Sequence, residues 1–124
     1  MPVIRRADAP TFELGGVRVR GGASPSRGAD EVLLFRVILE DDAAMPRHTH
    51  DHDEVYQVVS GSATAMIGDD SFEVSEGDTV IVPAGTEHEA FVDRGRRAEL
   101  VSSMLKGTVM IRLNGERVAP PWSE

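Results

Sequence analysis

The segment Arg47-His48-Thr49-His50-Asp51-His52-Asp53-Glu54 carries three of the four histidines of the chain. Successive side chains of an extended strand point to opposite faces, so we expect His48 and His50 to project from the same face. Two imidazoles placed in this way can reach one metal ion at about 2.0–2.2 Å each. Glu54 has the same parity and adds a carboxylate, so the segment predicts a metal site.

The fourth histidine, His88, follows the turn-forming residues Pro83-Ala84-Gly85-Thr86-Glu87. From a neighbouring strand it would complete a set of three imidazoles and one carboxylate, namely His48, His50, Glu54 and His88. Such ligands suit one divalent ion per chain, Fe, Mn, Ni, Co, Cu or Zn, and the spacing does not choose among these metals. The alternative interpretation is a group of polar surface side chains beside an acidic loop.

Working outward from this segment, the chain consists of short apolar or alternating runs separated by glycine, proline and acidic residues. The predicted strands are Glu31–Glu40, Val55–Val59, Ala63–Ile67, Ser71–Val74, Asp78–Val82, Glu87–Val92, Ala98–Leu105 and Thr108–Leu113. No window of helical length combines caps at both ends with an apolar period of 3.6 residues. The expected fold class is therefore all-β, a sandwich or a barrel.

Composition excludes several classes of function. The 124 residues include no cysteine, so disulfides, thiolate metal sites and cysteine nucleophiles are excluded. A net charge of −8 has the wrong sign for binding nucleic acid or an acidic membrane surface. No apolar run approaches the roughly 20 residues that span a bilayer, and residues 1–8 do not resemble a signal peptide. We expect a soluble, cytoplasmic protein.

The strand Glu31–Glu40 is apolar on both faces, although Arg36 interrupts one of them. An exposed strand should not have this pattern, so we expect a second copy of the chain or the N-terminal strands to cover the outer face. Near the other end of the chain, Trp122 is the only tryptophan. It could anchor the segment around it on the body of the protein or on a partner.

Two motifs in this chain resemble those of the cupin family, G-x₅-H-x-H-x₃-E-x₆-G and G-x₅-P-x-G-x₂-H-x₃-N. The matching residues are, in order, His48, His50, Glu54, Gly61, Gly77, Pro83, Gly85 and His88. Two positions depart from the motifs, because Asp42 replaces the first glycine and Val92 replaces the last asparagine. Neither position is a metal ligand in the family, so the departures affect only the placement within a subfamily.

The resemblance implies a small β-barrel of the jelly-roll type with a metal in its mouth, bound by His48, His50, Glu54 and His88. It implies one domain over residues 1–124. The core barrel would span about 30–113, with N-terminal strands in 1–29 and an extended tail over 114–124. Homodimers are frequent in the family, which agrees with the apolar outer face expected above.

Further side chains around the site have alternative roles. Tyr56 shares the parity of Glu54 and either donates or accepts a proton, as an inward tyrosine does in the cupin lyases that cleave dimethylsulfoniopropionate, or simply lines the barrel. His52 is an alternative ligand, a proton shuttle or a solvent-facing residue of a turn. Arg36 anchors a substrate carboxylate or forms an ion pair at an interface.

The leading functional hypothesis is a small metal-dependent enzyme resembling the quercetinase-like dioxygenases. Its substrate would be a small organic molecule that binds the metal through oxygen, with Glu54 or Tyr56 accepting a proton. A second hypothesis keeps the metal without redox chemistry, as in an isomerase, a lyase or a polyketide cyclase. A third is a non-catalytic cupin that uses the same pocket to hold a ligand.

Overall fold

The structure is a computed structural model that describes residues 2–124. Its strands are β1 (Thr11–Leu14), β2 (Val17–Ala23), β3 (Val32–Glu40), β4 (Ala44–His50), β5 (Glu54–Ile67), β6 (Asp70–Ser75), β7 (Thr79–Val82), β8 (His88–Phe91), β9 (Arg97–Leu105), β10 (Met110–Arg112) and β11 (Arg117–Val118). Short 3₁₀ turns form η1 (Arg6–Asp8), η2 (Pro25–Arg27) and η3 (Pro121–Ser123). This confirms the all-β fold class. Over the same residues, no helix has the length and apolarity needed to cross a membrane.

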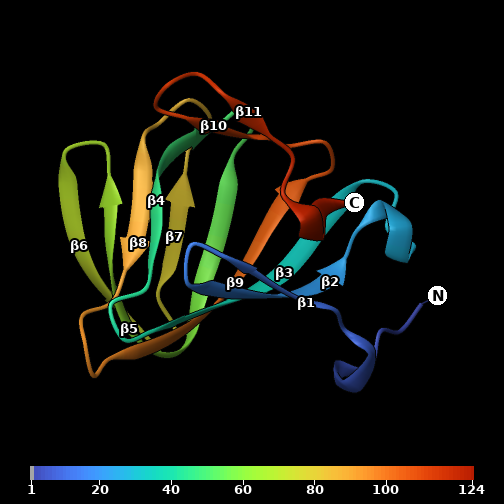
Figure 1. Cartoon of the computed structure of the whole chain (residues 1–124), viewed down its shortest axis with the longest axis horizontal. Helices are drawn as coiled ribbons and strands as arrows, with labels where there is room; N and C mark the ends of the chain where they lie inside the picture. Colours follow the sequence, from blue (N-terminus) through green and yellow to red (C-terminus); the bar gives the residue numbers. More distant parts are fainter. Residues whose placement is uncertain (1) are drawn as a thin grey trace.

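The strands form two antiparallel sheets that share β5. The first half of β5 pairs with β9 and β7, and the sheet continues from β9 through β3 and β2 to β1. The second half of β5 pairs with β6 and β8, and this sheet continues through β4 and β10 to β11. Figure 1 shows β4, β6 and β8 on one side of the molecule and β1, β2 and β3 on the other. This is the small jelly-roll barrel that the motifs predict.

The bend in β5 corrects one prediction from the sequence. Residues 55–59 and 63–67 were expected to form separate strands with a break at Gly61, but they belong to one strand that passes from one sheet to the other. Gly61 has a φ of 74°, and a Cβ at this position would lie 1.9 Å from the Arg97 carbonyl oxygen. A shift of register between Val58 and Ser60 marks a bulge beside it. A bulge and a turn use the same residues, so the sequence alone does not separate them.

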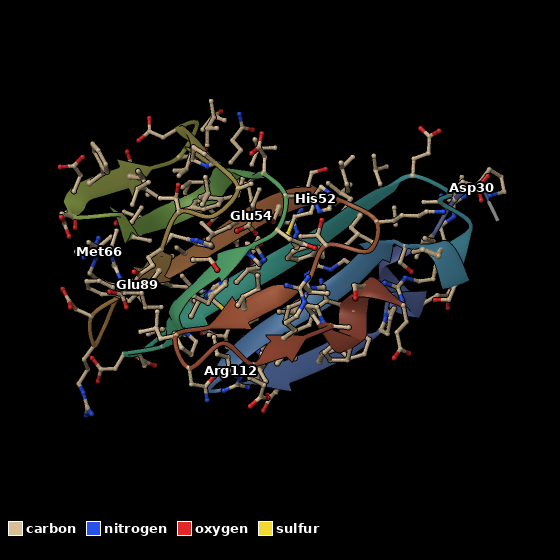
Figure 2. The ribbon with its side chains drawn as sticks, turned by 90° about the horizontal axis from the view of Figure 1, so that it is seen from above. Asp30, His52, Glu54, Met66, Glu89 and Arg112 are labelled. Atoms are coloured by element: carbon tan, nitrogen blue, oxygen red, sulfur yellow. The ribbon has the colours of Figure 1, made fainter. Side chains whose placement is uncertain are left out.

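The structure confirms the apolar inner face that the sequence predicts for the central strand β3. Its inward side chains Leu33, Phe35, Val37 and Leu39 belong to the hydrophobic core. On the outer face Leu34 remains 45% exposed. Figure 2 shows how far the sheets extend, since Asp30, just before β3, and Met66 of β5 lie at opposite ends of the molecule. The core between the sheets is therefore closed, whereas part of the outer face of β3 is uncovered.

The segment after β10 is not extended throughout. It forms the short strand β11 and then the turn η3, which contacts β2 and buries Trp122 to 2% exposure. Trp122 therefore anchors this segment on the body of the protein. The two departures from the motifs also have physical explanations. Asp42 has a left-handed backbone with φ 68°, a conformation that aspartate tolerates better than most residues with a side chain. Val92 is a core side chain.

Candidate metal centre

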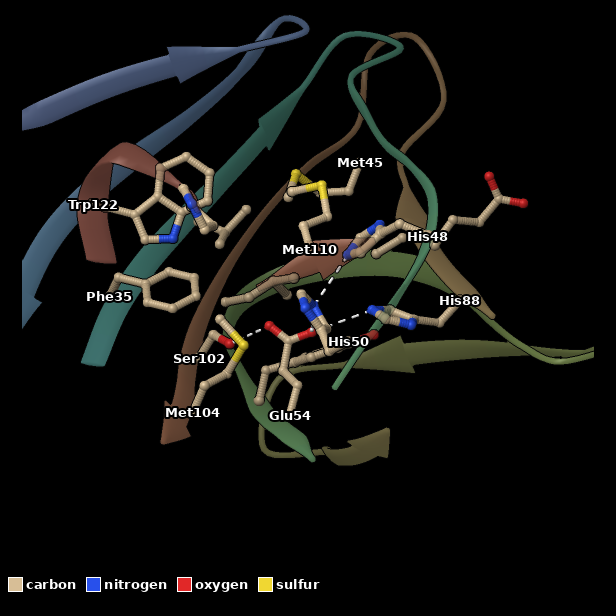
Figure 3. A pocket seen from close by; sticks show the side chains of 16 residues that line it. Phe35, Met45, His48, His50, Glu54, His88, Ser102, Met104, Met110 and Trp122 are labelled. Atoms are coloured by element: carbon tan, nitrogen blue, oxygen red, sulfur yellow. Dashed lines mark hydrogen bonds and ion pairs between the residues drawn. The ribbon is translucent and has the colours of Figure 1, made fainter. Parts of the chain in front are cut away.

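The three histidines of the predicted site come from one sheet and the glutamate from the other. His48 and His50 lie on β4, and His88 lies on β8 directly opposite His48 in the antiparallel register. Glu54 begins β5 where that strand still pairs with β9. All four side chains line one pocket between the sheets (Figure 3). The fold therefore brings the four predicted residues together.

Each of these imidazoles is oriented by a backbone carbonyl. Nδ1 of His48 donates to the Pro46 carbonyl oxygen at 2.5 Å, and Nδ1 of His50 donates to the Val109 carbonyl at 3.1 Å. Nδ1 of His88 donates to the Thr86 carbonyl at 2.9 Å. A carbonyl only accepts, so Nδ1 must carry the hydrogen. In the neutral ring Nε2 then carries no hydrogen and has a lone pair. This tautomer can bind a metal through Nε2.

The Nε2 atoms converge in a way that fits a metal ion. One ligand nitrogen from each of the three histidines lies within 4.8 Å of the others, and Nε2 of His48 and His50 are 3.1 Å apart. Two nitrogens bound at right angles at about 2.1 Å from one ion would lie roughly 3.0 Å apart. Nε2 of His88 is buried and has no hydrogen-bond partner within residues 2–124. Three converging nitrogens of this kind form a donor set that fits a divalent metal.

Glu54 is held in place by a residue on the neighbouring strand. Ser102 Oγ on β9 donates to Glu54 Oε2 at 2.5 Å. The other carboxylate oxygen, Oε1, lies 3.5 Å from Nε2 of both His50 and His88. Burial raises the pKa of Glu54, but the contacts with His50, His88 and Ser102 outweigh it and hold the pKa well below its usual range. The carboxylate is therefore ionised and faces the histidines.

The histidines differ in how readily they take up a proton. Burial is the largest effect on His48 and lowers its pKa to about 4, so its ring is neutral at pH 7. Burial also acts to lower the pKa of His50, but the neighbouring Glu54 carboxylate outweighs it and the net shift is upward. A proton at this site would thus reside on His50 beside Glu54. A divalent cation would take the place of that proton.

The rest of the pocket is small and mainly apolar. Its volume is about 40 Å³, and its lining away from the histidines includes Val37, Tyr56, Leu100, Met104 and Met110. Tyr56 is only 6% exposed. Burial, and to a smaller extent the charge of Glu54, raise the pKa of the Tyr56 phenol. Tyr56 therefore lies in the pocket as a neutral phenol.

Two residues considered from the sequence lie outside the pocket. The side chain of His52 is 46% exposed and its Nδ1 lies 3.3 Å from Asp51 Oδ1, so it occupies the solvent-facing turn. Arg36 points to the outer face of β3, where its guanidinium donates to Glu99 at 2.6 Å. It therefore does not reach a substrate in this pocket.

The acidic residues between the ligands have structural roles that the sequence analysis did not assign. Asp51 Oδ1 accepts a hydrogen bond from the Val109 amide at 2.9 Å, next to the carbonyl that orients His50. Asp53 Oδ1 accepts one from the Ala84 amide at 2.8 Å, in the turn before His88. These contacts tie the loop between β4 and β5 to the two segments that complete the site.

Sequence reasoning also missed the contribution of β9 and of Trp122 to the pocket. Leu100, Ser102 and Met104 alternate along β9 and all face inward. Their parity was visible in the sequence, but the register that places Ser102 opposite Tyr56 was not. No sequence signal placed Trp122 in this pocket, because it arrives through the packing of a segment far along the chain.

Comparisons with known proteins agree with this architecture. A family model described as a cupin domain matches residues 35–104. An uncharacterised protein of Streptomyces coelicolor is 48% identical over 40 residues, which cover 32% of this chain and 38% of that protein. Another curated relative is matched over 19% of its length, so this chain spans well under half of either relative.

Two solved structures extend the likeness to most of the chain. The polyketide cyclase RemF of Streptomyces resistomycificus has a TM-score of 0.77 at 20% identity, covering 91% of this chain and 87% of that one. A predicted oxalate decarboxylase of Thermotoga maritima has a TM-score of 0.73 at 15% identity, covering 83% and 97%. At these identities the likeness concerns the fold alone.

Proposed function

This chain belongs to the cupin family, and on that premise we propose that it is a small metal-dependent enzyme acting on an organic substrate that binds through oxygen. The observation that carries the proposal is the convergence of three histidine Nε2 atoms whose Nδ1 atoms are all committed to backbone carbonyls. Buried polar atoms of a purely structural core are normally paired, whereas Nε2 of His88 has no hydrogen-bond partner among residues 2–124.

His48, His50, His88 and Glu54 would hold the ion. A divalent metal in this donor set would supply Lewis acidity and, for Fe, Mn, Co, Ni or Cu, access to redox chemistry. Three neutral imidazoles and one carboxylate leave a net charge of +1 at the centre. The carbonyls of Pro46, Thr86 and Val109 keep the rings turned toward it. These residues thus provide a preorganised site for an anionic oxygen.

The two expected catalytic residues, Glu54 and Tyr56, differ in charge, and we therefore propose different roles for them. Glu54 is ionised and is the proton acceptor that we propose, whereas Tyr56 is a neutral phenol that would donate a hydrogen bond to the substrate. A carboxylate is a weak base. It therefore suits a substrate whose proton is already acidic, such as an enol or a β-dicarbonyl compound. The apolar lining excludes bulk water from that proton transfer.

For the reaction we propose first a dioxygenase, in which the enolate-like anion formed by proton transfer to Glu54 reacts with O₂. A second candidate, a non-redox cyclase, is favoured by the likeness to a polyketide cyclase over 91% of the chain. The same proton transfer serves both reactions, and they differ in whether O₂ is consumed.

One experiment separates the two reactions. The chain would be loaded separately with Fe²⁺, Mn²⁺, Ni²⁺, Co²⁺ and Zn²⁺, and mixed with quercetin or with pentane-2,4-dione. We expect O₂ uptake with at least one redox-active metal and none with Zn²⁺. Substrate conversion without O₂ uptake, including by the Zn²⁺ form, would favour non-redox chemistry, the class to which the cyclase belongs. Metal and probe binding without any turnover would favour a ligand-binding protein, and failure to bind any metal would overturn the proposal.

We also propose that the protein is a homodimer. A row of side chains crosses the outer face of the first sheet at paired positions, from Leu34 to Ser103, Val55 and Ile81. The three apolar side chains of this row, those of Leu34, Val55 and Ile81, are 41–64% exposed. An apolar row on a sheet face is typical of an interface between copies. It lies on the side of the sheet opposite the metal centre.

A further inference from the structure

A single buried donor in the pocket is not explained by the metal centre. The Trp122 side chain is 2% exposed, and within residues 2–124 its Nε1 has no hydrogen-bond acceptor. An indole nitrogen can only donate. Buried donors of this kind are nearly always paired, so this one calls for an acceptor that residues 2–124 do not supply.

Trp122 lies across the pocket from the histidines. It lines the same cavity as His48, His50 and His88, and Figure 3 shows it beside Phe35 on the opposite side from them. The Phe35 and Trp122 rings pack with centroids 5.7 Å apart, and Phe12 packs against Trp122 at 6.4 Å. In Figure 3 the indole nitrogen is on the edge of the ring nearer Phe35, which lines the same pocket.

The backbone around Trp122 is fastened to the loop that follows β2. The Arg27 guanidinium donates to the Trp122 carbonyl oxygen at 2.9 Å and, through Nε, to the Gly22 carbonyl at 2.5 Å. Ser24 Oγ, which is fully buried, donates to the Glu124 carbonyl at 2.5 Å. The indole is thus held by hydrogen bonds on its backbone and by aromatic packing on its ring. Its N–H has a fixed position relative to the histidines.

The space between these two ends is apolar. Side chains of Val37, Leu100, Met104 and Met110 line it. With a volume of about 40 Å³ the pocket is narrow. Methionine side chains are flexible, so Met104 and Met110 can move to admit a larger group. A molecule that satisfies the whole pocket would have an oxygen at the histidine end, an apolar body and a hydrogen-bond acceptor at the Trp122 end.

We propose that Trp122 is a substrate-binding residue, whose indole N–H donates to an oxygen acceptor on the part of the substrate farthest from the histidines. The inference rests on the proposed function only in taking this pocket as the substrate site. The substrate class that follows is a compact, mainly apolar compound with oxygen atoms at both ends, such as a phenol that carries a carbonyl group opposite its hydroxyl. Arg27 and Ser24 are positioning residues, because they act on the backbone that carries the indole.

A matched pair of probes tests this proposal in the unmodified protein. 4-Hydroxyacetophenone and 4-ethylphenol have similar shapes, but only the ketone has an acceptor at the end opposite the hydroxyl. The chain has one tryptophan, so a ¹⁵N-labelled, Zn²⁺-loaded sample gives one indole N–H signal by nuclear magnetic resonance. We expect the ketone to move the indole proton downfield and 4-ethylphenol to move it much less. An indole signal that does not respond to the ketone, or responds equally to both probes, would overturn the proposal.

Substitution supplies an independent measurement. Trp122→Phe keeps an aromatic ring and removes the N–H, so the preference for the ketone over 4-ethylphenol, measured by calorimetry, should fall about fivefold to tenfold. Phe12→Leu loosens the packing around the indole but keeps its N–H, and should preserve the preference. An unchanged preference in Trp122→Phe contradicts the proposal. Should that variant not fold, the indole signal of the wild-type chain decides the question.

A failure of the proposal for Trp122 can be distinguished from a failure of the proposed metal-dependent function. If Zn²⁺ does not bind at the histidines, the metal-dependent function fails, and the indole titration repeated without metal still tests Trp122. If Zn²⁺ binds but the indole does not respond selectively to the ketone, the metal centre stands and the role of Trp122 is withdrawn.

Discussion

Ser102 Oγ donates a hydrogen bond to Glu54 Oε2 at 2.5 Å, across the boundary between β9 and β5. This contact fixes one oxygen of the carboxylate and leaves the other, Oε1, 3.5 Å from both His50 and His88. Ser102 therefore sets the orientation of Glu54, which is the only carboxylate in the proposed ligand set.

Ser102→Ala should weaken metal binding without removing it. Groups that hydrogen-bond to a metal ligand commonly contribute about tenfold to a hundredfold in affinity. We expect a loss of that size for Zn²⁺, measured by competition with a chelating dye. The adjacent Ser103 donates to the Leu33 carbonyl and provides the matched control. Equal losses in Ser102→Ala and Ser103→Ala would mean that the effect comes from strand stability rather than from Glu54.

His88→Ala should lower the number of metal ions bound per chain while the barrel remains folded. His88 Nε2 has no partner in the described chain, so its removal breaks no hydrogen bond made by that atom. Elemental analysis measures the metal, and circular dichroism measures the fold. His52→Ala is the control, because that side chain is 46% exposed in the turn and should not affect metal content. Full metal content in His88→Ala would remove this residue from the ligand set.

Acid should release the metal. Protons and metal ions compete for the same imidazole nitrogens, so occupancy falls as pH falls. The Glu54 carboxylate raises the pKa of His50, so this ring takes up a proton at a higher pH than His48 does. The pKa of His48, about 4, delays its own protonation to more acidic solution. We expect occupancy to decline between about pH 7 and pH 5. Zn²⁺ occupancy that is constant across this range, followed by equilibrium dialysis, would contradict imidazole ligation.

Gly61→Ala should destabilise the fold severely. The left-handed backbone at Gly61 costs a residue with a side chain about 1–2 kcal/mol, and the added Cβ would also overlap the Arg97 carbonyl oxygen at 1.9 Å. We expect a loss of at least ~3 kcal/mol in the free energy of unfolding in urea, or no folded protein. Gly68 has a φ of 59° but open space around it, so Gly68→Ala should cost only about 1–2 kcal/mol. Similar losses in the two variants would refute the steric explanation.

Leu34→Asp should shift the proposed homodimer toward monomers, since it places a charge within the apolar row on the outer face, at its β3 end. Leu34 is 45% exposed in the single chain, so the substitution leaves the core intact. Leu113, 65% exposed, lies outside that row and offers Leu113→Asp as the control. Analytical ultracentrifugation reports the mass. A wild-type chain that sediments as a monomer would refute the dimer directly.

The sequence by itself determined the fold class and named the four residues of the proposed metal centre. Alternation along an extended segment has a period of two residues, so the spacing of His48 and His50 placed them on one face, although the sequence did not predict β4 itself as a strand. The turn residues between Pro83 and Gly85 likewise marked the point from which His88 returns on the next strand. Such features are local, because they depend on the spacing and backbone preferences of neighbouring residues.

The tertiary structure decided which distant strands meet and in which register. Ser102 is 48 residues from Glu54, and their contact exists only because β9 pairs with β5 in one particular alignment. Gly61 marked a break in the sequence but proved to be the bend at which β5 changes sheets. Trp122 lies in the pocket because its backbone is held by Arg27, which is 95 residues away in the sequence. Pairing and packing between distant segments depend on the energy of the whole assembled core, which no single stretch of sequence encodes.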